Sequence, residues 1–482
     1  MTNHDSIALD KDRVDFSVLR QMPLKWLKAH CALPFAQDAE CVYIAFGKGF
    51  EQAEIERAQE FFKHKFVKGV SASEHQILGL LSEFELVESF ENLMRELKFE
   101  LENSANSDKS AVSKLFELIV AQSIQKRASD IHIEPDEDGA MVRFRVDGIL
   151  SVFLRLETSI YQALIFYAKL LAHLNVAEQR RAQDGSFSLL VNGESYDFRL
   201  SSLPLLYGES LVLRVLEHKQ DFLTLNALSL DSEVLAKFKK RIHAPLGLVL
   251  LTGPTGSGKS TTLYAALNEI KSTDKKIITA EDPIEYRLPL VQQIVLNEKA
   301  GLDFNNALRT ILRQDPDIIV IGEIRDEESL DIALKSSLTG HLVFSTLHTN
   351  DAVSAIARML DMNAKAYLIA SALSVVIAQR LVRKLCEHCK VKSAKKHPEF
   401  EGEFYTSCGC EHCKMSGYAG REVVSEFLFV DESVAEMIRT NAKPSKILAY
   451  ARENGFKTMF EVGLQKAREG KTSIDELLRV MR

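Results

Sequence analysis

The sequence lacks an excess of basic residues. Its 60 Lys and Arg are outnumbered by 67 Asp and Glu, which gives a formal net charge of -7. A protein whose main task is to neutralise nucleic-acid phosphates needs clustered excess Lys and Arg. The acidic balance therefore argues against a dedicated nucleic-acid-binding protein, although it leaves room for local basic patches.

Secretory and membrane-spanning signals are also missing. Residues 1–10 contain neither a basic nor an apolar segment, so they do not match a secretory signal and we expect a cytoplasmic protein. The most apolar long segment, residues 366–378, is interrupted by Ser371 and Ser374. It falls short of the ~20 apolar residues that cross a bilayer. We expect a buried helix there, and membrane association only through a partner or a surface contact.

The seven cysteines are not spread along the chain as a disulfide framework would be, because five fall between residues 386 and 413. This clustering indicates a metal site. No tandem repeat typical of a solenoid is visible. The contents of 46% hydrophobic and 26% charged residues are ordinary for a globular protein. At roughly 150 residues per domain, the length predicts about three domains.

Residues 1–100 mix short helical patterns with one apolar strand at 42–46 and hold no catalytic constellation, which suggests a docking module. The polar stretch 102–110 has little to bury and is typical of a linker. A helix is expected at 112–125, followed by strands at 130–134, 141–146 and 149–154. Asp-Gly dipeptides in the turns between these strands favour hairpins. A second small α/β domain is therefore expected, ending near Glu217.

From Leu246 the pattern changes to short apolar runs that alternate with helical segments. The runs lie at residues 248–251, 277–280, 318–321 and 342–345. Buried strands that alternate with helices predict a parallel sheet covered on both faces. The fold class of the whole chain is accordingly α/β and multidomain.

A phosphate-binding loop directly follows the first of these strands. The run Gly253-Pro254-Thr255-Gly256-Ser257-Gly258-Lys259-Ser260 fits G-x-x-x-x-G-K-[ST] at every fixed position, and Thr261 continues into the next helix. Its glycines let backbone N–H groups converge on phosphate oxygens, Lys259 offers a charge to the β and γ phosphates, and Ser260 offers a hydroxyl ligand to Mg²⁺. A glycine-rich turn that binds nothing is the alternative.

Carboxylates follow two other strands. Glu323 stands at the carboxyl end of the strand 318–321, where parallel sheets place their ligands. It can serve the Mg²⁺ shell or polarise water, unless it is a solvated loop residue. Glu281, Asp282 and Glu285 follow the strand 277–280 and bring further carboxylates to the same edge. We expect one of them to orient the attacking water.

His341 and His348 flank the fourth apolar strand. From the residues alone, either one could sense the γ phosphate or merely cap a buried turn. Arg309 and Arg313 precede the strand 318–321 at helical spacing, where ion pairs and phosphate contacts are equally compatible with the pattern.

Two Cys-x-x-Cys pairs predict zinc. Cys386 and Cys389 are separated from Cys410 and Cys413 by 20 intervening residues, a spacing typical of two knuckles that share one tetrahedral ion. Four thiolates leave no open position, so a structural rather than a catalytic zinc is expected. His388 and His412 could substitute as ligands, and Cys408 is a spare thiol. Unmetallated cysteines in a reduced cytoplasm are the alternative.

From about Ser129 onward the chain resembles the type II secretion and type IV pilus assembly ATPases. The resemblance is carried by the phosphate-binding loop and by dense motifs, which are Ser129–Pro135 (SDIHIEP), Arg143–Gly148 (RFRVDG), Gln183–Gly185 (QDG), Glu281–Glu285 (EDPIE), Arg313–Asp326 (RQDPDIIVIGEIRD), Thr339–Ala352 (TGHLVFSTLHTNDA) and Gln379–Cys386 (QRLVRKLC).

The resemblance implies specific roles. Glu281–Glu285 match the family's Asp box, Glu323 its Walker B carboxylate, and His341 and His348 its His box. Arg199 and Arg214 match arginines of the second domain that reach toward nucleotide across domain or subunit boundaries. A guanidinium there would stabilise charge on the transferring phosphoryl group.

The resemblance also implies an architecture. It consists of a docking domain (1–100), a linker (101–110), a PAS-like domain (111–220), a RecA-like ATPase domain (221–385), a zinc module (386–413) and a C-terminal helical subdomain (414–482). The expected protein is a homohexameric ATPase using ATP, Mg²⁺ and Zn²⁺, peripheral at the inner membrane. Its residues 1–100 would contact an inner-membrane platform protein.

The zinc insertion is common in the secretion and extension members of the family and absent from retraction members, which favours fibre assembly. Two rival functions differ in class. One is a nucleic-acid motor, such as a helicase or a conjugation-type DNA pump, which the acidic balance disfavours. The other is a scaffold that binds ATP without hydrolysing it. Protein secretion, pilus extension and DNA uptake are not distinguished by the sequence.

Overall fold

A computed structural model describes residues 6–7, 9, 14–47, 50–103, 111–216, 224–296, 302–393, 397–410 and 412–481. The chain divides into two compact units, Met1–Leu216 and Glu217–Arg482, and each is considered by itself. Most of the expected linker, residues 104–110, lies outside the described residues. No helix within the described ranges has both the length and the apolar character needed to cross a membrane.

The first unit begins with a small α/β subdomain. Its four-stranded sheet has the order β1-β4-β3-β2, with strands Ser6–Ile7, Phe66–Ala72, Cys41–Phe46 and Ala32–Gln37. Helices α1 (Phe16–Leu19), α2 (Leu24–Ala29) and α3 (Gln52–Gln59) accompany it. β3 matches the apolar strand that the sequence predicts. Its buried Val42, Ile44 and Phe46 belong to one core cluster together with Ile77 and Leu81 of the helix that follows.

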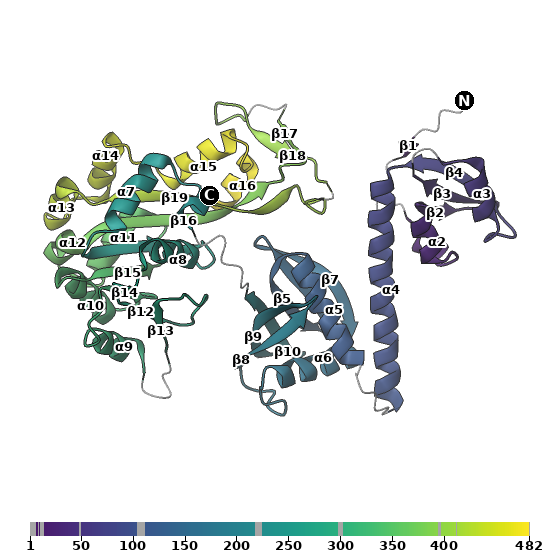
Figure 1. Ribbon diagram of the computed structural model, residues 1–482, viewed down its shortest axis with the longest axis horizontal. Helices are drawn as coiled ribbons and strands as arrows, with labels where there is room; N and C mark the ends of the chain where they lie inside the picture. The colour runs from purple at the N-terminus through teal and green to yellow at the C-terminus, as the bar shows by residue number, and fades with distance from the viewer. Residues whose placement is uncertain are drawn as a thin grey trace. The chain divides into compact units, whose positions relative to one another are not determined.

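That following helix, α4, runs over 30 residues from Glu74 to Asn103 (Figure 1). Its first turns join the core of the small subdomain, while Phe90 and Leu97 belong to the next core cluster, with residues of α5. One continuous helix therefore takes part in both cores of this unit. It also extends past the expected domain boundary at residue 100.

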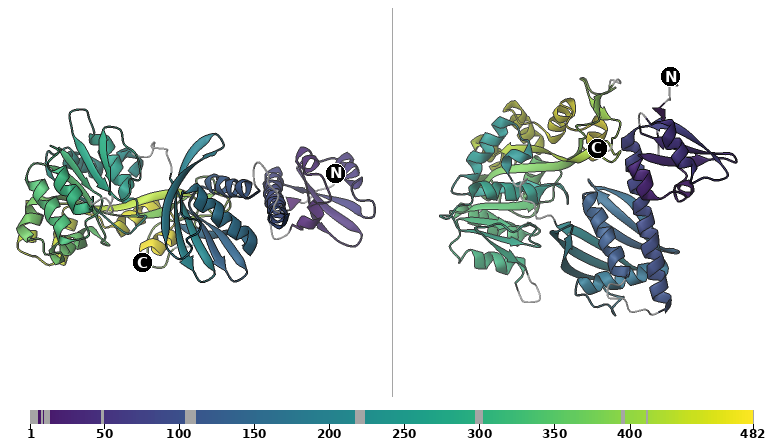
Figure 2. Two further views of the ribbon diagram at one scale, coloured as in Figure 1. Left: turned by 90° about the horizontal axis from the view of Figure 1, so that it is seen from below. Right: turned by 45° about the vertical axis from the view of Figure 1, so that its right-hand side comes forward.

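The second part of this unit is a six-stranded sheet of order β7-β6-β5-β10-β9-β8. The strands are β5 (Ala128–Asp136), β6 (Gly139–Val146), β7 (Ile149–Glu157), β8 (Gln183–Val191), β9 (Glu194–Leu205) and β10 (Gly208–Leu216), all paired antiparallel. Helices α5 (Ala111–Gln125) and α6 (Thr158–Leu171) pack their apolar residues against it. The turned views in Figure 2 show the twist of this sheet.

The second unit is built on a seven-stranded sheet of order β13-β12-β14-β15-β11-β16-β19. The strands are β11 (Gly247–Thr252), β12 (Ile277–Glu281), β13 (Val291–Val295), β14 (Ile318–Ile321), β15 (Leu342–Leu347), β16 (Leu373–Leu385) and β19 (Tyr418–Phe429). All pairs are parallel except β16 with β19. The four apolar runs predicted as buried strands are β11, β12, β14 and β15.

Helices cover both faces of this sheet, as the alternating pattern predicts. On one face, Val249 and Leu251 pack with the 3-10 helix η2 (Leu225–Leu228), α7 (Ser232–Ile242) and α8 (Lys259–Ile270). On the other face, Leu248 and Leu250 belong to a core with helices α9 (Phe304–Ile311), α10 (Glu327–Leu338), α11 (Ala352–Asp361), α12 (Ala366–Ala372), α13 (Glu432–Arg439), α14 (Pro444–Glu453), α15 (Met459–Arg468) and α16 (Ile474–Met481). The α/β fold class is confirmed.

Two further expectations differ from the structure. The prediction of one buried helix over residues 366–378 is wrong, because α12 ends at Ala372 and β16 begins at Leu373. The β-branched residues Val375, Val376 and Ile377 favour the strand, which pairs with β11 inside the sheet. The segment 414–482 is more than a helical subdomain, since β19 within it belongs to the same sheet as β11.

Candidate functional site

The functional loops meet at one edge of the seven-stranded sheet. Because β11, β12, β14 and β15 are parallel and in register, their carboxyl ends lie together. The phosphate-binding loop follows β11, Glu323 follows β14, His348 follows β15, and the carboxylate group 281–285 ends β12. The structure therefore brings together most of the residues that the sequence predicts for nucleotide binding.

The phosphate-binding loop turns sharply into α8, which begins at Lys259. Gly253, Gly256 and Gly258 have φ angles of +145°, +77° and +88°, a region that favours glycine. A Cβ atom at Gly253 would lie 2.5 Å from the carbonyl oxygen of Gln379, so no larger residue fits there without rearrangement. The loop thus presents backbone N–H groups at a helix N-terminus, the arrangement that binds phosphate.

Lys259 closes the loop in this structure. Its Nζ donates to the carbonyl oxygens of Gly253, at 2.8 Å, and Pro254, at 3.1 Å. Burial lowers the pKa of Lys259, an effect that Glu323 opposes and Arg380 reinforces. Both neighbours are therefore close enough to act on the ammonium group. Ser260, the expected Mg²⁺ ligand, is exposed one position further along α8, and Thr261 is half-buried.

Glu323 lies between a histidine and an arginine. Its Oε1 is 3.2 Å from His348 Nε2, and its Oε2 accepts a hydrogen bond from Arg325 Nε at 3.0 Å. The carboxylate is half-buried, while His348 remains open to solvent with a side-chain exposure of 46%. His348 is therefore accessible to solvent while it touches Glu323.

Glu281 is held inside the protein. Its carboxylate accepts hydrogen bonds from Tyr264, from Thr279 Oγ1 at 2.6 Å and from Gln293 Nε2 at 3.2 Å. Burial and the adjacent Glu281 raise the pKa of Tyr264, so the phenol stays protonated as the donor. By contrast, Asp282 is exposed and Glu285 is half-buried. These contacts make Glu281 an anchor between α8 and β12.

Of the predicted residues in the second unit, His341 is not brought to this edge, whereas Arg199 and Arg214 belong to the first unit and are described within it. His341 precedes β15 and lies at the opposite edge of the sheet from His348, about 20 Å away along the strand. Its Nδ1 is 2.9 Å from the carbonyl oxygen of Ser336, which fits a turn-capping role. Arg199 and Arg214 face each other across β9 and β10 in the first unit. There Arg214 Nε donates to the buried Asp130 at 3.0 Å.

Residues of β16 that were not selected individually from the sequence support the loop. Gln379 Nε2 donates to the carbonyl oxygen of Ser257 at 2.9 Å, and Arg380 Nη2 donates to Asn350 Oδ1 at 3.2 Å. The sequence did contain a signal for them, because Gln379 and Arg380 are the first two residues of the family motif Gln379–Cys386. Among the described residues, Ser257 Oγ and Gln379 Oε1 are buried without a hydrogen-bond partner. Unsatisfied buried polar atoms at such a loop are compatible with a ligand site.

The weaker arginine candidates have other partners. Arg309 forms an ion pair with Glu328, and Arg313 Nη2 donates to Thr310 Oγ1 at 3.3 Å. The first contact joins α9 to α10, and the second lies between the end of α9 and the turn that follows it. They support the structural alternative for these two residues.

The four cysteines converge in the connection between β16 and β19, at the end of this strand pair. Sγ–Sγ distances are 3.7 Å for Cys386–Cys410, 3.8 Å for Cys389–Cys413 and 3.8 Å for Cys410–Cys413. Four sulfurs at a Zn–S distance of ~2.3 Å around a tetrahedral ion would be about 3.8 Å apart. The donor set therefore fits zinc.

The surroundings of the thiols agree with a metal site. Burial alone would raise the pKa of Cys413, but backbone N–H groups of Cys410 and Gly417 lower it to about 7. The rings of His388 and His412 are in contact, with centroids 4.1 Å apart and planes tilted by 44°, and they are not part of the ligand cluster. Cys408 is exposed and outside that cluster too. A short hairpin of β17 (Lys390–Lys392) and β18 (Tyr405–Ser407) completes the module.

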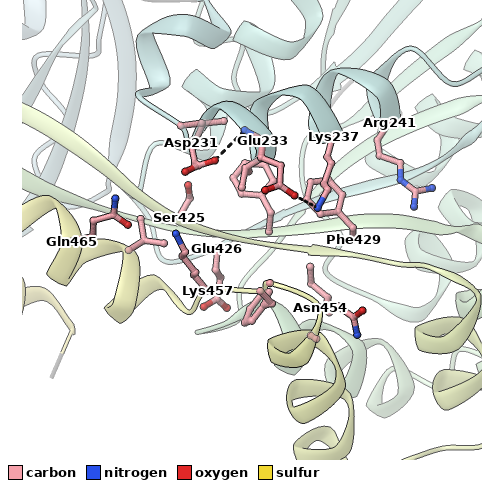
Figure 3. Close-up of a pocket in the computed structure, with 18 of the residues that line it drawn as sticks. Asp231, Glu233, Lys237, Arg241, Ser425, Glu426, Phe429, Asn454, Lys457 and Gln465 are labelled. Atoms are coloured by element: carbon pink, nitrogen blue, oxygen red, sulfur yellow. Dashed lines mark hydrogen bonds and ion pairs between the residues drawn. The ribbon is translucent and has the colours of Figure 1, made fainter.

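A groove lies elsewhere in the second unit. It has a volume of about 850 Å³ and runs between α7, β19 and the segments from α14 to α15. Figure 3 shows Lys237 and Arg241 of α7 on one side and Asn454, Lys457 and Gln465 on the other. None of the predicted nucleotide residues lines this groove, so it is not the nucleotide site.

Comparison with known proteins identifies the family. A family described as type II/IV secretion system protein matches residues 105–479, and the MshEN domain matches residues 4–89. Type II secretion system protein HxcR of Pseudomonas aeruginosa is 43% identical over 78% of each chain. Type II secretion system ATPase E of Vibrio cholerae is 38% identical, covering 88% of this chain and 86% of its own. The type IV pilus assembly ATPase PilB of Thermus thermophilus is 43% identical over 77% of this chain and 43% of its own length.

Solved structures agree with this assignment. The pilus retraction motor PilT with bound ADP is 28% identical, covers 75% of this chain and 96% of its own, and superposes with a TM-score of 0.54. The Legionella pneumophila ATPase DotB, at 22% identity and a TM-score of 0.58, shares the fold and covers 76% of this chain and 95% of its own. The chain therefore belongs to the type II/IV secretion system protein family.

Proposed function

We propose that this chain is an ATP-hydrolysing motor that drives assembly of a type II secretion pseudopilus or a type IV pilus-like fibre. The observation that carries the proposal is the convergence of the phosphate-binding loop, Lys259, Glu323 and His348 at one sheet edge. Relatives named as secretion and pilus assembly ATPases support the choice of process.

Hydrolysis at this site needs Lys259 to exchange partners. The ammonium group now bonded to the carbonyl oxygens of Gly253 and Pro254 would move to the β and γ phosphates. Ser260 would hold Mg²⁺, which supplies positive charge against the phosphate oxygens. His348, exposed beside Glu323, would contact the γ phosphate and report its presence to that carboxylate.

Water activation falls to an acidic residue with a free oxygen. Glu281 is occupied by three donors in the interior, so we assign to it the role of positioning β12 and α8. Glu285 and Asp282 follow it at the same edge and are more accessible. Of these, we assign the orientation of water to the half-buried Glu285. Its position is held by its backbone N–H, which donates to Tyr264 Oη at 3.3 Å.

The remaining parts of the proposal concern assembly. We propose a homohexamer in which Arg199 and Arg214 of the six-stranded sheet reach nucleotide held by a neighbouring subunit. Arg214 forms an ion pair with Asp130, and half of its side chain remains exposed. ATP turnover would then move the domain of residues 111–220 against the nucleotide-binding domain.

We further propose a cytoplasmic motor that is peripheral to the inner membrane. Residues 1–100, which contain the MshEN match, would dock on an inner-membrane platform protein. The Cys386, Cys389, Cys410 and Cys413 module would carry a structural zinc, and we take it as a mark of a fibre-assembling rather than a retracting motor. A pull-down with a chain lacking residues 1–100 tests the docking role, because platform binding that survives the truncation contradicts it.

The central experiment measures ATP hydrolysis by the purified chain and its Lys259→Ala and Glu323→Ala variants, with the oligomer monitored by size-exclusion chromatography. Activity confined to the hexamer and lost in both variants is the expected result. Activity of the monomer, or activity that requires DNA, would favour a nucleic-acid motor. ATP binding without turnover in a hexamer would favour a scaffold.

A further inference from the structure

A buried carboxylate on β19 joins two helices that begin in different parts of the second unit. Glu426 Oε1 accepts a hydrogen bond from the backbone N–H of Ala352 at 2.7 Å, and its Oε2 accepts one from Met459 at 2.8 Å. Ala352 is the first residue of α11 and Met459 is the first residue of α15. Glu426 itself is 4% exposed.

Both bonds satisfy amide groups that a helix cannot satisfy by itself. The first N–H groups of a helix have no intrahelical acceptor, and they carry the positive end of the helix dipole. In α11 and α15 the capping side chains Asp351 and Thr458 bond amides further along, those of Ser354 and Glu461. Each oxygen of Glu426 therefore has a separate donor, and one carboxylate ties two helix N-termini together.

One side of this clamp leads directly to the nucleotide site. α11 is preceded by the loop 348–351, which contains His348, the partner of Glu323. Thr349 in that loop bonds Thr252 at the end of β11, with Oγ1 atoms 2.7 Å apart. Arg380 donates to Asn350 in the same loop. A shift of the α11 N-terminus would therefore displace His348 and the start of the phosphate-binding loop.

The other side leads to the C-terminal helices. α15 begins at Met459, directly after the segment that borders the groove between α7 and β19, and Figure 3 shows Glu426 on β19 beside Lys457. α15 is also attached to β19 by a second buried carboxylate, because Lys466 Nζ bonds Glu422 Oε1 at 2.6 Å. Among the described residues Glu422 makes no hydrogen bond to α11, so of these two carboxylates only Glu426 reaches both helices.

We propose that Glu426 is a positioning residue that couples the C-terminal helix α15 to the His348 loop of the nucleotide site. The proposal rests on the ATPase function proposed above. Under this proposal Glu426 connects the C-terminal helices mechanically to the sheet edge that carries the nucleotide site, although its carboxylate touches neither nucleotide nor metal.

Glu426→Gln tests the coupling with almost no change in volume. A carboxamide keeps one acceptor oxygen but turns an NH2 group toward the second amide N–H, so one of the two bonds is lost. Glu422→Gln is the matched control, since it weakens the attachment of α15 without touching α11. Both variants are compared with the full-length parent as the same oligomer.

Three readouts distinguish coupling from general loosening. We expect Glu426→Gln to lower kcat for ATP at least tenfold while KM changes less than threefold, because the phosphate-binding loop itself is intact. Hydrogen exchange should accelerate in peptides that contain Ala352 and in peptides that contain Met459. Glu422→Gln should accelerate exchange in α15 and leave kcat within about twofold of the parent.

Other outcomes overturn the proposal. An equal loss of kcat in Glu422→Gln and Glu426→Gln would mean that kcat depends on the packing of α15 and not on the carboxylate shared by the two helices. Unchanged kcat in Glu426→Gln, with faster exchange at Ala352, would show that the site does not depend on this helix terminus. If the parent chain itself hydrolyses no ATP, the proposed function fails, whereas the exchange experiment still reports whether one carboxylate holds both helices.

Discussion

A buried ion pair in the six-stranded domain allows a quantitative test of the structure. Lys169 Nζ on α6 lies 2.7 Å and 3.0 Å from the two oxygens of Glu209 on β10, and 2.7 Å from the carbonyl oxygen of Glu178. Ser202 Oγ donates to the same carboxylate at 2.8 Å. Lys169 and Glu209 are 1% and 5% exposed. The pair thus links α6, β9, β10 and the loop at Glu178.

Lys169→Met removes the cation and leaves Glu209 buried with one hydroxyl donor. Breaking one side of such a pair costs about 3–5 kcal/mol, because the remaining charge stays uncompensated in the interior. For a unit of roughly 200 residues this corresponds to a Tm lower by about 6–20 °C. Lys169→Met combined with Glu209→Leu removes both charges, and it should recover most of the loss because apolar replacements of a buried pair are often neutral.

The assay is differential scanning calorimetry of the full chain, in which the transition of this unit is followed in the single and double variants. Lys98→Met is a control in the same unit, since its pair with Glu157 is exposed and should contribute little to stability. A single variant within 1 °C of the parent would refute the reasoning. So would a double variant that is less stable than Lys169→Met, because the cost would then lie in packing and not in the stranded charge.

Three further predictions concern the second unit. Gly253→Ala should weaken ATP binding by at least 100-fold in isothermal titration calorimetry, because its Cβ would collide with the carbonyl oxygen of Gln379, and binding within threefold of the parent contradicts the loop geometry. Burial alone would raise the pKa of Glu476, but hydrogen bonds from Arg479 and Arg383 lower it from 4.5 to about 2. The lowered pKa contributes about 3 kcal/mol to the stability of the folded state above pH 4.5, and this contribution is lost as the pH falls toward 2. Glu476→Gln should therefore remove this part of the pH dependence of Tm. A variant whose Tm falls with acid as steeply as that of the parent would contradict the prediction. Cys413→Ser should abolish the one zinc per chain expected in native mass spectrometry and accelerate hydrogen exchange around residues 386–418, whereas retained zinc would point to another ligand set.

Contiguous motifs were the most predictable part of the protein. The apolar strand, the glycine-rich loop and the helix from Lys259 follow one another in the chain, so their spacing alone defines a phosphate-binding turn. The two Cys-x-x-Cys pairs are similar, since each pair supplies two ligands from one tight turn. Glu323 was predictable for a related reason, because the carboxyl ends of parallel strands share an edge.

Predictions were weaker where the outcome depends on distant parts of the chain. Residues 366–378 are mostly apolar, and only pairing with β11 and β19 decides that their second half is a strand. His341 and His348 stand close in sequence, but the extended strand between them places them at opposite sheet edges. Glu281 was one of three carboxylates among which the sequence could not choose the water-orienting one, and Tyr264, Thr279 and Gln293 enclose its carboxylate.

The sequence by itself determined the chemistry that depends on local order, namely a nucleotide loop with its lysine, a carboxylate after a parallel strand and a set of four thiols that fits zinc. Only the tertiary structure decided which residues support that chemistry from a distance. Gln379 reaches Ser257 across 122 residues, and Glu426 reaches Ala352 across 74. The reason is physical: spacing along the chain determines the geometry of a turn, whereas contacts between strands and helix ends depend on how the sheet orders its strands.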